Sequence, residues 1–360
     1  MTEVTNYIDR LVAELCPDGV EYRLLGEIVK IKNGKGYKDF LPGDIPVYGS
    51  GGVMTYVDTF AYDKPTVLIP RKGSLGNLFY LEEPFWNVDT IFYTEIDESC
   101  VIPKYLFYVL RSAELEKLNT AGGVPSLTQK VLNKVLIPVP PLEVQGAIVE
   151  ILDKFTNLEA ELEAELEART LQYEYYRDSL FEALDCPRVS LDSFAKIKNG
   201  KTYKDFGAGN IPVYGSGGIM TYVDRFAYDK PTVLIPRKGS LRNLFYLEEP
   251  FWNVDTIFYT EIDEEQVIPK FLYYFLKTAH LEDLNTAGGV PSLTQKVLNK
   301  VLVPVPSLEE QQRIVDILDR FDALTTSLSK GLPAELAARR SQYEYYRDQL
   351  LSFPRKGENQ

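Results

Sequence analysis

The sequence predicts an α+β protein: two β-rich domains joined by two long helices that form an antiparallel coiled coil with pseudo-two-fold symmetry. Three features lead to this fold class: a long internal repeat, β-rich runs broken by Gly, Pro and Asp, and two apolar stripes with helical spacing. The chain has 360 residues, of which 45% are hydrophobic and 25% charged, as is ordinary for a globular protein. This length suits about two domains.

The repeat defines the domain organisation. Residues 30–104 and 196–270 align without a gap at an offset of 166, and 66 of these 75 positions are identical. A solenoid unit has roughly 20–50 residues, so each copy here is a whole domain. The predicted parts are an N-terminal helix and link (1–21), a first β-rich domain (22–141), a central helix (142–186), a second β-rich domain (187–307), a C-terminal helix (308–353) and a tail (354–360).

The elements follow from local patterns. Runs such as TVLIP and DTIFYTEI predict strands, IPKYLFYVLRSAELEKLN has helical spacing, and AGGVPSLTQ predicts a loop that leads into a short helix. The segment PVPPLEVQ ends the first domain, and Pro141 suits the first turn of the central helix. In the C-terminal helix the offset grows to 170, which places a four-residue insertion near 330–333. Its Gly331 and Pro333 predict a break or a kink.

Composition excludes several classes of protein. No apolar run reaches the roughly 20 residues of a membrane span, and the N-terminus lacks a basic signal region. Cys16, Cys100 and Cys186 are far apart and predict reduced thiols in the cytoplasm, and the single His280 rules out His-based triads and most His-ligated metal sites. Residues 141–190 carry −8 of the net charge of −13, so a basic surface elsewhere is compatible with the acidic total.

The motif series identifies a family. KIKNGKxYKDF, YGSGG, PRKGS, FWNVDT, GGVPSL, PxPPLxxQ and a helix ending in QYEYYRD occur in this order, and the series resembles the DNA-specificity subunit of type I restriction–modification systems. The resemblance implies two target-recognition domains that each read half of a bipartite site in double-stranded DNA. It also implies helices that dock two methyltransferase subunits, through which motor-nuclease subunits are recruited. Catalysis and the cofactor S-adenosylmethionine are then expected in the partners, with no catalytic residue, cofactor or metal in this chain.

Several duplicated segments supply candidate DNA-binding residues. Lysines of KIKNGKxYKDF suit phosphates, Asn suits adenine, and its Gly allows close backbone approach, although a solvated lysine-rich turn is the alternative. YGSGG is either a phosphate-binding loop or a tight turn, PRKGS either presents a guanine-reading Arg or ends an edge strand, and AGGVPSLT either binds phosphate or forms an ordinary N-cap. FWNVDT predicts core, because Trp86 alternates with apolar neighbours, and stacking of Trp86 on DNA bases is the alternative. The candidates are Lys32, Asn33, Lys35, Tyr37, Lys38, Tyr48, Ser50, Arg71, Lys72, Ser74, Ser126, Lys198, Asn199, Lys201, Tyr203, Lys204, Tyr214, Ser216, Arg237, Lys238, Ser240, Arg242 and Ser292.

The long helices supply the candidate partner-binding residues. The glutamates of ELEAELEAR surround a helix, which predicts a solvated face or a docking face for a basic partner. Adjacent tyrosines in YEYYRD point to different faces, so one can serve the coiled coil and the other a partner. The candidates are Glu161, Glu163, Glu165, Tyr175, Tyr176, Tyr345 and Tyr346.

The leading hypothesis is therefore a non-catalytic DNA-recognition scaffold. Because the two domains are nearly identical, they should read nearly the same half-site in opposite orientations, which predicts a split palindrome. A stand-alone methyltransferase or nuclease is the rival, but the sequence lacks a Gly-rich cofactor loop, an Asn/Asp-Pro-Pro motif and a spaced acidic cluster. A coiled-coil dimeriser without DNA contact ranks last, because it would need no duplicated lysine-rich loops.

Overall fold

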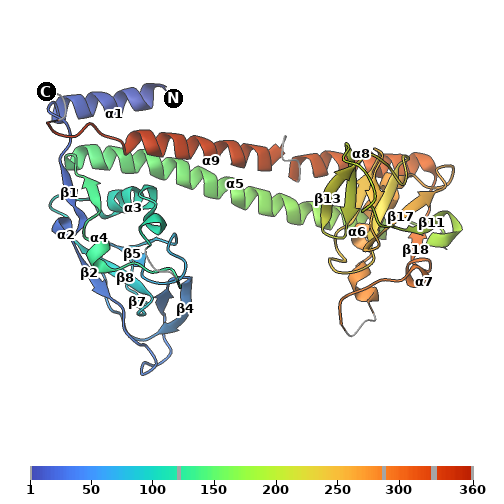
Figure 1. Cartoon of the computed structure of the whole chain (residues 1–360), viewed down its shortest axis with the longest axis horizontal. Coiled ribbons are helices and arrows are strands. Elements are labelled where there is room, and N and C mark those ends of the chain that lie inside the picture. Colours follow the sequence, from blue (N-terminus) through green and yellow to red (C-terminus); the bar gives the residue numbers. More distant parts are fainter. Residues whose placement is uncertain (1, 120–122, 286–288, 326–330, 358–360) are drawn as a thin grey trace. The chain divides into compact units, whose positions relative to one another are not determined.

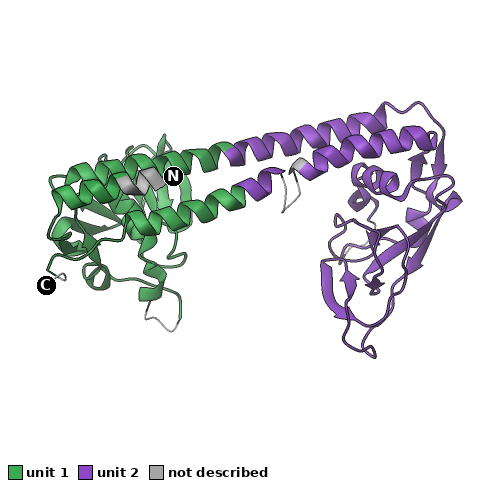
Figure 2. Cartoon of the chain, turned by 90° about the horizontal axis from the view of Figure 1, so that it is seen from above, with its two compact units in different colours: residues 1–161, 336–360 green, residues 162–335 purple. Residues whose placement is uncertain are grey.

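The computed structural model describes residues 2–119, 123–285, 289–325 and 331–357. The chain divides into two compact units, coloured separately in Figure 2. Unit 1 comprises residues 1–161 and 336–360, and unit 2 comprises residues 162–335. Each unit therefore combines one β-rich domain with helical segments from both copies of the repeat.

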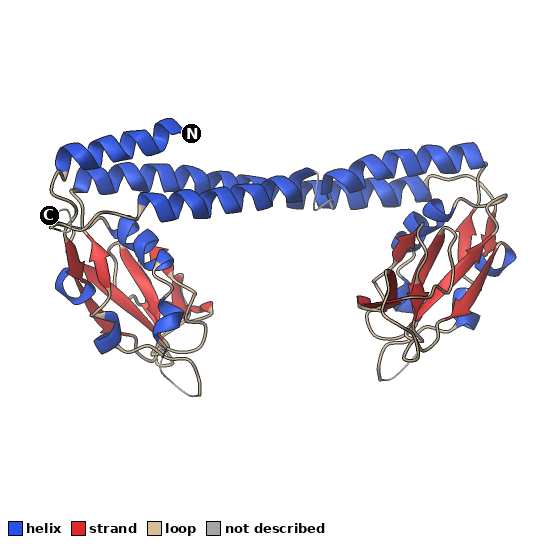
Figure 3. Ribbon diagram, turned by 45° about the horizontal axis from the view of Figure 1, so that its top comes forward, coloured by secondary structure: helices blue, strands red, loops and turns tan. Residues whose placement is uncertain are grey.

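The β-rich domain of unit 1 contains two small sheets and a two-stranded ribbon, with its strands red in Figure 3. One sheet has the antiparallel order β2-β8-β5-β6, and the other has the order β4-β3-β7, in which β3 and β7 are parallel. The ribbon pairs β1 with β9. The elements are α1 (Thr2–Leu15), β1 (Tyr22–Leu24), α2 (Leu25–Ile28), β2 (Val29–Asn33), β3 (Ile45–Gly49), β4 (Gly52–Val57), β5 (Thr66–Pro70), β6 (Phe79–Leu81), β7 (Trp86–Asn87), β8 (Ile91–Ile96), α3 (Pro103–Ser112), the 3-10 helix η1 (Leu115–Leu118), α4 (Gln129–Leu132) and β9 (Leu136–Pro138).

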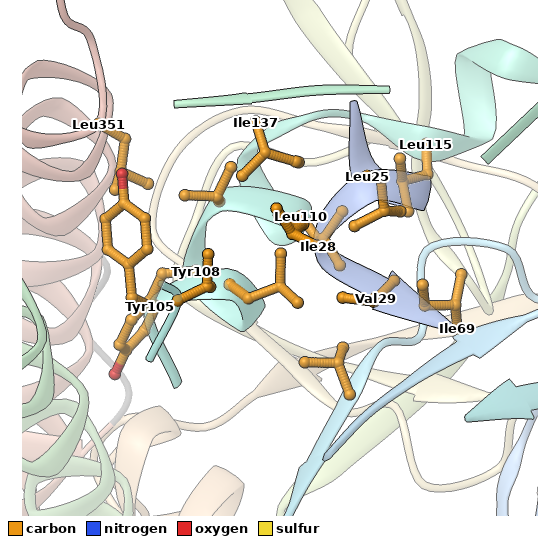
Figure 4. Packing of buried hydrophobic residues seen from close by; sticks show 14 of the residues in the cluster. Leu25, Ile28, Val29, Ile69, Tyr105, Tyr108, Leu110, Leu115, Ile137 and Leu351 are labelled. Carbon is orange, nitrogen blue, oxygen red and sulfur yellow. The ribbon is translucent and has the colours of Figure 1, made fainter. Parts of the chain in front are cut away.

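The core of unit 1 lies between the larger sheet and the helices. The strand β5 is buried at every residue, as its continuous apolar sequence predicts. Amphipathic α3 covers this sheet, and its Tyr105 and Tyr108 are buried in the same cluster as Ile69 and Ile137 (Figure 4). Leu351, which comes from the second copy of the repeat, belongs to this cluster too. The core is therefore completed by the far end of the sequence.

Unit 2 repeats the architecture with the same sheet orders and registers. Its elements, visible with those of unit 1 in Figure 1, are β10 (Arg188–Ser190), η2 (Leu191–Ser193), β11 (Ala195–Asn199), β12 (Ile211–Gly215), β13 (Gly218–Val223), β14 (Thr232–Pro236), β15 (Phe245–Leu247), β16 (Trp252–Asn253), β17 (Ile257–Ile262), α6 (Pro269–Thr278), η3 (Leu281–Leu284), α7 (Gln295–Leu298), β18 (Leu302–Pro304) and α8 (Leu308–Thr325). The predicted duplication of an α+β domain is thus confirmed.

The central helix α5 (Leu142–Glu182) has 41 residues and agrees with the prediction. The C-terminal helix differs from it. Instead of one helix over 308–353, the structure has α8 and α9 (Gly331–Leu350), and residues 326–330 between them lie outside the described part. Gly331 has φ of 78°, a left-handed conformation that does not continue an α-helix. Pro333 lacks the N–H of an interior helical residue and is accommodated in the first turn of α9.

Helices pair in antiparallel fashion inside each unit. In unit 1, Phe155 of α5 stacks on Tyr346 of α9 with ring centroids 5.6 Å apart, and Glu159 pairs with Arg340 at 2.6 Å. From Phe155 to Glu159 the residue numbers rise along α5, while those of their partners on α9 fall from Tyr346 to Arg340. The two helices are therefore antiparallel. In unit 2, Tyr176 of α5 stacks on Phe321 of α8 at 5.9 Å, which is the same contact with the copies exchanged.

Two polar joints fasten the β-rich domain of unit 1 to α5. Buried Gln145 accepts from the N–H of Ile102 and donates to the carbonyls of Cys100 and Pro140, at 2.7–2.8 Å. Asp153 accepts from the hydroxyl of Tyr108 at 2.5 Å and from Lys104 Nζ at 2.7 Å. Gln311 and Asp319 form the equivalent joints in unit 2. They fasten each β-rich domain to the adjoining helix.

Candidate nucleic-acid interface

The turn at Asp89 and Thr90, just before β8, is the point where several predicted DNA-binding segments meet. The hydroxyl of Thr90 accepts from the N–H of Ser50 at 3.3 Å. The Thr90 carbonyl accepts from the N–H groups of Arg71 and Lys72 at 2.8 and 3.2 Å. The YGSGG and PRKGS segments therefore share one anchor, although they begin 22 residues apart in the sequence.

Arg71 and Lys72 lie on this surface with limited freedom. The Arg71 guanidinium lies 5.9 Å from the centroid of the Phe92 ring and donates to the Asp89 carbonyl at 3.4 Å. Lys72 Nζ is 3.9 Å from the Asp89 carboxylate. Both cations follow β5, which is paired on both sides, so the edge-strand alternative for PRKGS is wrong. A preoriented guanidinium suits bidentate recognition of a guanine edge.

A cavity joins the lysine-rich segment to the same turn. It has a volume of about 610 Å³ and is lined by residues 36–39, Met54 and residues 88–90. Tyr37 and Lys38 thus lie beside Asp89 and Thr90, and exposed Lys35 follows β2. The surface around Thr90 therefore collects Tyr37, Lys38, Ser50, Arg71 and Lys72 from three segments.

Other residues of KIKNGKxYKDF lie elsewhere or have other partners. The segment begins as strand β2, where Lys32 pairs with Glu95 of the adjacent strand at 3.2 Å, and Asn33 ends the strand exposed. A Cβ on Gly34 would lie 2.1 Å from the carbonyl oxygen of Val88. Gly34 therefore lets its loop pass close to the backbone of Val88 in the same protein. This finding corrects the expectation that the backbone at Gly34 approaches DNA.

Three further predictions are refined by the structure. YGSGG forms the hairpin turn between β3 and β4, with Gly52 at φ of 110°, so the tight-turn alternative applies. Tyr48 packs its ring on Phe79, and burial raises the pKa of its hydroxyl. Phe85 of FWNVDT is fully buried, which confirms the predicted core role.

The AGGVPSLT segment supplies an ordinary N-cap, as its alternative predicts, although the capping residue is Thr128 and not Ser126. The N-cap of α4 is Thr128, whose hydroxyl accepts from the N–H of Val131 at 3.3 Å. Ser126 instead forms a bridge with Lys72 and donates its N–H to Asn119 at 3.0 Å. It therefore joins the Arg71–Lys72 segment, near which Ser74 is exposed. The first two residues of the AGGVPSLT segment, 121 and 122, lie outside the described part.

The second copy forms the same surface around Asp255 and Thr256. Thr256 accepts hydrogen bonds from the N–H groups of Ser216, Arg237 and Lys238, as Thr90 does in the first copy. Lys198 pairs with Glu261 as Lys32 pairs with Glu95. Arg242 is directed away from these residues: it pairs with Glu282 at 2.8 Å and lines a cavity with residues of α5. The remaining predicted residues occupy the repeated positions, namely Asn199, Lys201, Tyr203, Lys204, Tyr214, Ser240 and Ser292.

Asp89 and Thr90 were missed by the sequence prediction. Both belong to FWNVDT, whose apolar residues indicated core. The sequence did contain a signal for them, because in both copies a carboxylate and a hydroxyl residue directly follow a buried run. Gln145 and Asp153 were missed as well, since a lone polar residue on a long amphipathic helix does not reveal its partner.

The adjacent tyrosines of α5 and α9 divide between two environments. Tyr176 and Tyr346 stack on Phe321 and Phe155 within the helix pairs, while Tyr175 and Tyr345 are 70% and 59% exposed. The side chains of Glu161, Glu163 and Glu165 are exposed on α5, where Glu165 pairs with Arg169 at 3.5 Å. An acidic face and two exposed tyrosines are thus available for a partner.

Within the described ranges, the structure shows no cluster of three His, Cys, Asp or Glu side chains able to hold a metal ion. Over the same ranges, no helix combines the length and the apolar character that crossing a membrane requires.

Comparison with known proteins agrees with this architecture. A family model described as the type I restriction modification DNA specificity domain matches residues 17–168 and again residues 185–338. The chain belongs to this family. A putative type I restriction enzyme specificity subunit of Haemophilus influenzae is 30% identical over 370 residues, which cover 93% of this chain and 96% of that protein. A type I restriction enzyme specificity subunit of Escherichia coli is 33% identical over 298 residues, covering 73% and 74%.

Solved structures of such subunits share the fold. The crystal structure of a type I restriction–modification S subunit from M. genitalium superposes with a TM-score of 0.62 at 20% identity, covering 92% of this chain and 96% of that one. A chain from a study of complex assembly in the type I system gives a TM-score of 0.64 at 16% identity, covering 92% and 97%. The match shows that this specificity subunit shares their fold of two β-rich domains with a long helix.

Proposed function

We propose that this specificity subunit reads a bipartite, split-palindromic site in double-stranded DNA and is itself non-catalytic. The observation that carries the proposal is the duplicated surface around Thr90 and Thr256, where an arginine, a lysine and hydroxyl groups meet in each β-rich domain. Arginine suits guanine edges and lysine suits phosphates. Because the two surfaces hold the same residues, they favour the same half-site.

The methylated bases of the host genome test this proposal. Single-molecule sequencing of host DNA should reveal one motif made of a half-site, an unread spacer and the inverted half-site. The control is a host in which the gene for this chain is deleted, where the motif should lose its methylation. A motif with two unrelated halves would contradict the symmetric reading.

We also propose that the helices scaffold two cytoplasmic methyltransferase subunits, which would bind S-adenosylmethionine and recruit the motor-nuclease subunits. The acidic face of α5 and the exposed Tyr175 and Tyr345 support this assignment. Charge reversal of Glu161 and Glu165 should reduce co-purification of the methyltransferase at least several-fold. Glu159 should remain unaltered, because it pairs with Arg340 inside unit 1. Unchanged co-purification by a folded variant would rule out this face, and turnover by the rigorously pure chain would overturn the non-catalytic assignment.

A further inference from the structure

The differences between the two nearly identical domains are concentrated in one region. Six of the nine substitutions between residues 30–104 and 196–270 fall within residues 36–59. These six are Gly36 to Thr202, Leu41 to Gly207, Pro42 to Ala208, Asp44 to Asn210, Val53 to Ile219 and Thr59 to Arg225. Most of the divergence between the copies therefore affects one loop and one hairpin.

The structure brings this loop and the end of the hairpin together. The N–H of Asp58 donates to the Leu41 carbonyl at 3.0 Å, and the N–H of Asp224 donates to the Gly207 carbonyl at 3.1 Å. Arg225, at the position of Thr59, lies with its guanidinium 5.1 Å from the centroid of the Phe206 ring. An arginine stacked on an aromatic ring is partly preoriented and keeps its donors available.

This region adjoins the surface that the copies share. Gly36 lines the cavity that includes Asp89 and Thr90, and a Cβ at Gly36 would meet nothing within 4 Å. Thr202 therefore adds a side chain at a position that is open in the first copy, and its hydroxyl accepts from the N–H of Lys204 at 3.4 Å. The divergent region thus borders the shared surface at the position of Gly36 and Thr202.

Charge distinguishes the two versions. The change from Asp44 to Asn210 removes a negative charge, and the change from Thr59 to Arg225 adds a positive one. The second domain is therefore more positive by two charges in this region. DNA is a polyanion, so the difference favours closer contact between the second domain and the phosphate backbone.

We propose that the second recognition domain contacts the phosphate backbone beside its half-site through Arg225, a contact that the first domain lacks. The inference rests on the proposed DNA-reading function. It adds that the two domains read the same central bases but make different numbers of phosphate contacts. The other arginine gained by the second domain, Arg242, pairs with Glu282 at 2.8 Å, and this carboxylate offsets its charge.

The test uses the full chain, purified alone and with its methyltransferase subunits, on a DNA site selected from a random library. The salt dependence of the dissociation constant should lose about one unit of slope in Arg225→Thr, because each phosphate contact contributes about 0.9 to the slope in B-form DNA. When salt is raised from 50 to 200 mM, the fold-loss of DNA affinity should therefore be roughly 3.5 times smaller for Arg225→Thr than for the wild type. The reciprocal Thr59→Arg should gain about one unit, and Arg225→Lys should keep the wild-type slope.

Arg242→Gly is the matched control, since it removes the other extra arginine, and its slope should equal that of the wild type. An unchanged slope in Arg225→Thr, or an equal change in Arg242→Gly, would overturn the inference while leaving sequence-specific binding intact. Failure of the wild type to select any motif would instead overturn the proposed function. Thermal unfolding of each variant confirms that the slopes compare folded proteins.

Discussion

Gln145 shows how much depends on a single side chain in this protein. Its amide satisfies the N–H of Ile102 and the carbonyl of Cys100, just before α3, and the carbonyl of Pro140, just before α5. Thr90 has a similar role on the candidate DNA-binding surface, where its hydroxyl and carbonyl fix the segments of Ser50, Arg71 and Lys72. At the scale of residues, short polar residues therefore define the positions of the longer cationic side chains.

Replacing Gln145 should therefore destabilise unit 1. Gln145→Ala leaves a buried N–H and two carbonyl groups without their partner, so we expect a loss of about 2–4 kcal/mol in the free energy of unfolding. Urea unfolding followed by circular dichroism measures the effect. Gln349→Ala is the control, because Gln349 is an exposed residue of α9 in unit 1 and its change should cost under about 0.5 kcal/mol. Equal midpoints for the two variants would refute the role of the joint.

Arginine and lysine variants should separate base reading from phosphate binding. Lys35→Ala and Lys38→Ala are expected to weaken binding similarly for all sequences and to lower the salt slope by about one each. Arg71→Ala is expected to relax the choice at one base pair, with about 1–3 kcal/mol of discrimination lost. Competition with single-base variants of the site provides the measurement. The base-reading assignment fails for Arg71 if its variant behaves like the lysine variants.

At the scale of elements, the joint between α3 and α5 links the sheet to the helix. Tyr108 donates to Asp153 at 2.5 Å, and Tyr274 donates to Asp319 at the same distance in unit 2. Burial is the largest cause that raises the pKa of both hydroxyls, and the hydrogen bond to the carboxylate adds to it. Each tyrosine consequently stays protonated in the folded state at a pH where the unfolded chain has begun to ionise.

This shift predicts a loss of stability in alkali. Below a pH of about 10, both states are protonated and the contribution is fully present; above it, the unfolded state releases the proton first and stability declines. Tyr108→Phe with Tyr274→Phe should be less stable at pH 7 but should lose less stability between about pH 9 and 11. Denaturant midpoints across this range test the prediction, and parallel curves for variant and wild type would contradict it.

At the scale of the whole molecule, the two copies exchange helical segments. Unit 1 buries Tyr343, Leu350 and Leu351 from the second copy, and unit 2 buries Tyr173 and Phe181 from the first. Phe181 and Leu351 are equivalent positions at an offset of 170. Each unit therefore lacks part of its core unless the other copy contributes a helix end.

Residues 1–185 alone should therefore form a homodimer. The 41-residue helix α5 extends roughly 60 Å, so its end cannot complete the core at its own start while remaining helical. A second molecule can supply Tyr173 and Phe181 where the intact chain uses Tyr343 and Leu351. Analytical ultracentrifugation should show a dimer with the same DNA preference as the intact chain, whereas the fragment carrying Phe181→Asp should be monomeric or unfolded. A stable monomeric fragment would contradict the exchange.

The sequence by itself determined the duplication, the fold class, the central helix and the family. These rest on signals that one chain displays directly: identity between copies, apolar periodicity and an ordered series of motifs. It also placed Arg71 and Lys72 correctly at the end of a strand. Such features depend on residues that are close together in the chain, so they can be recognised without knowing the folded structure.

Only the tertiary structure decided which residues meet. The segments of Ser50, Arg71 and Lys38 meet at Asp89 and Thr90. Arg242, in contrast, pairs with Glu282. Gly34 approaches Val88 of its own chain, and Leu351 completes a core that begins at Ile8. Each of these contacts joins residues far apart in the chain, and local propensity carries no information about such partners. The physical reason is that burial and hydrogen-bond satisfaction are settled by the packed molecule as a whole.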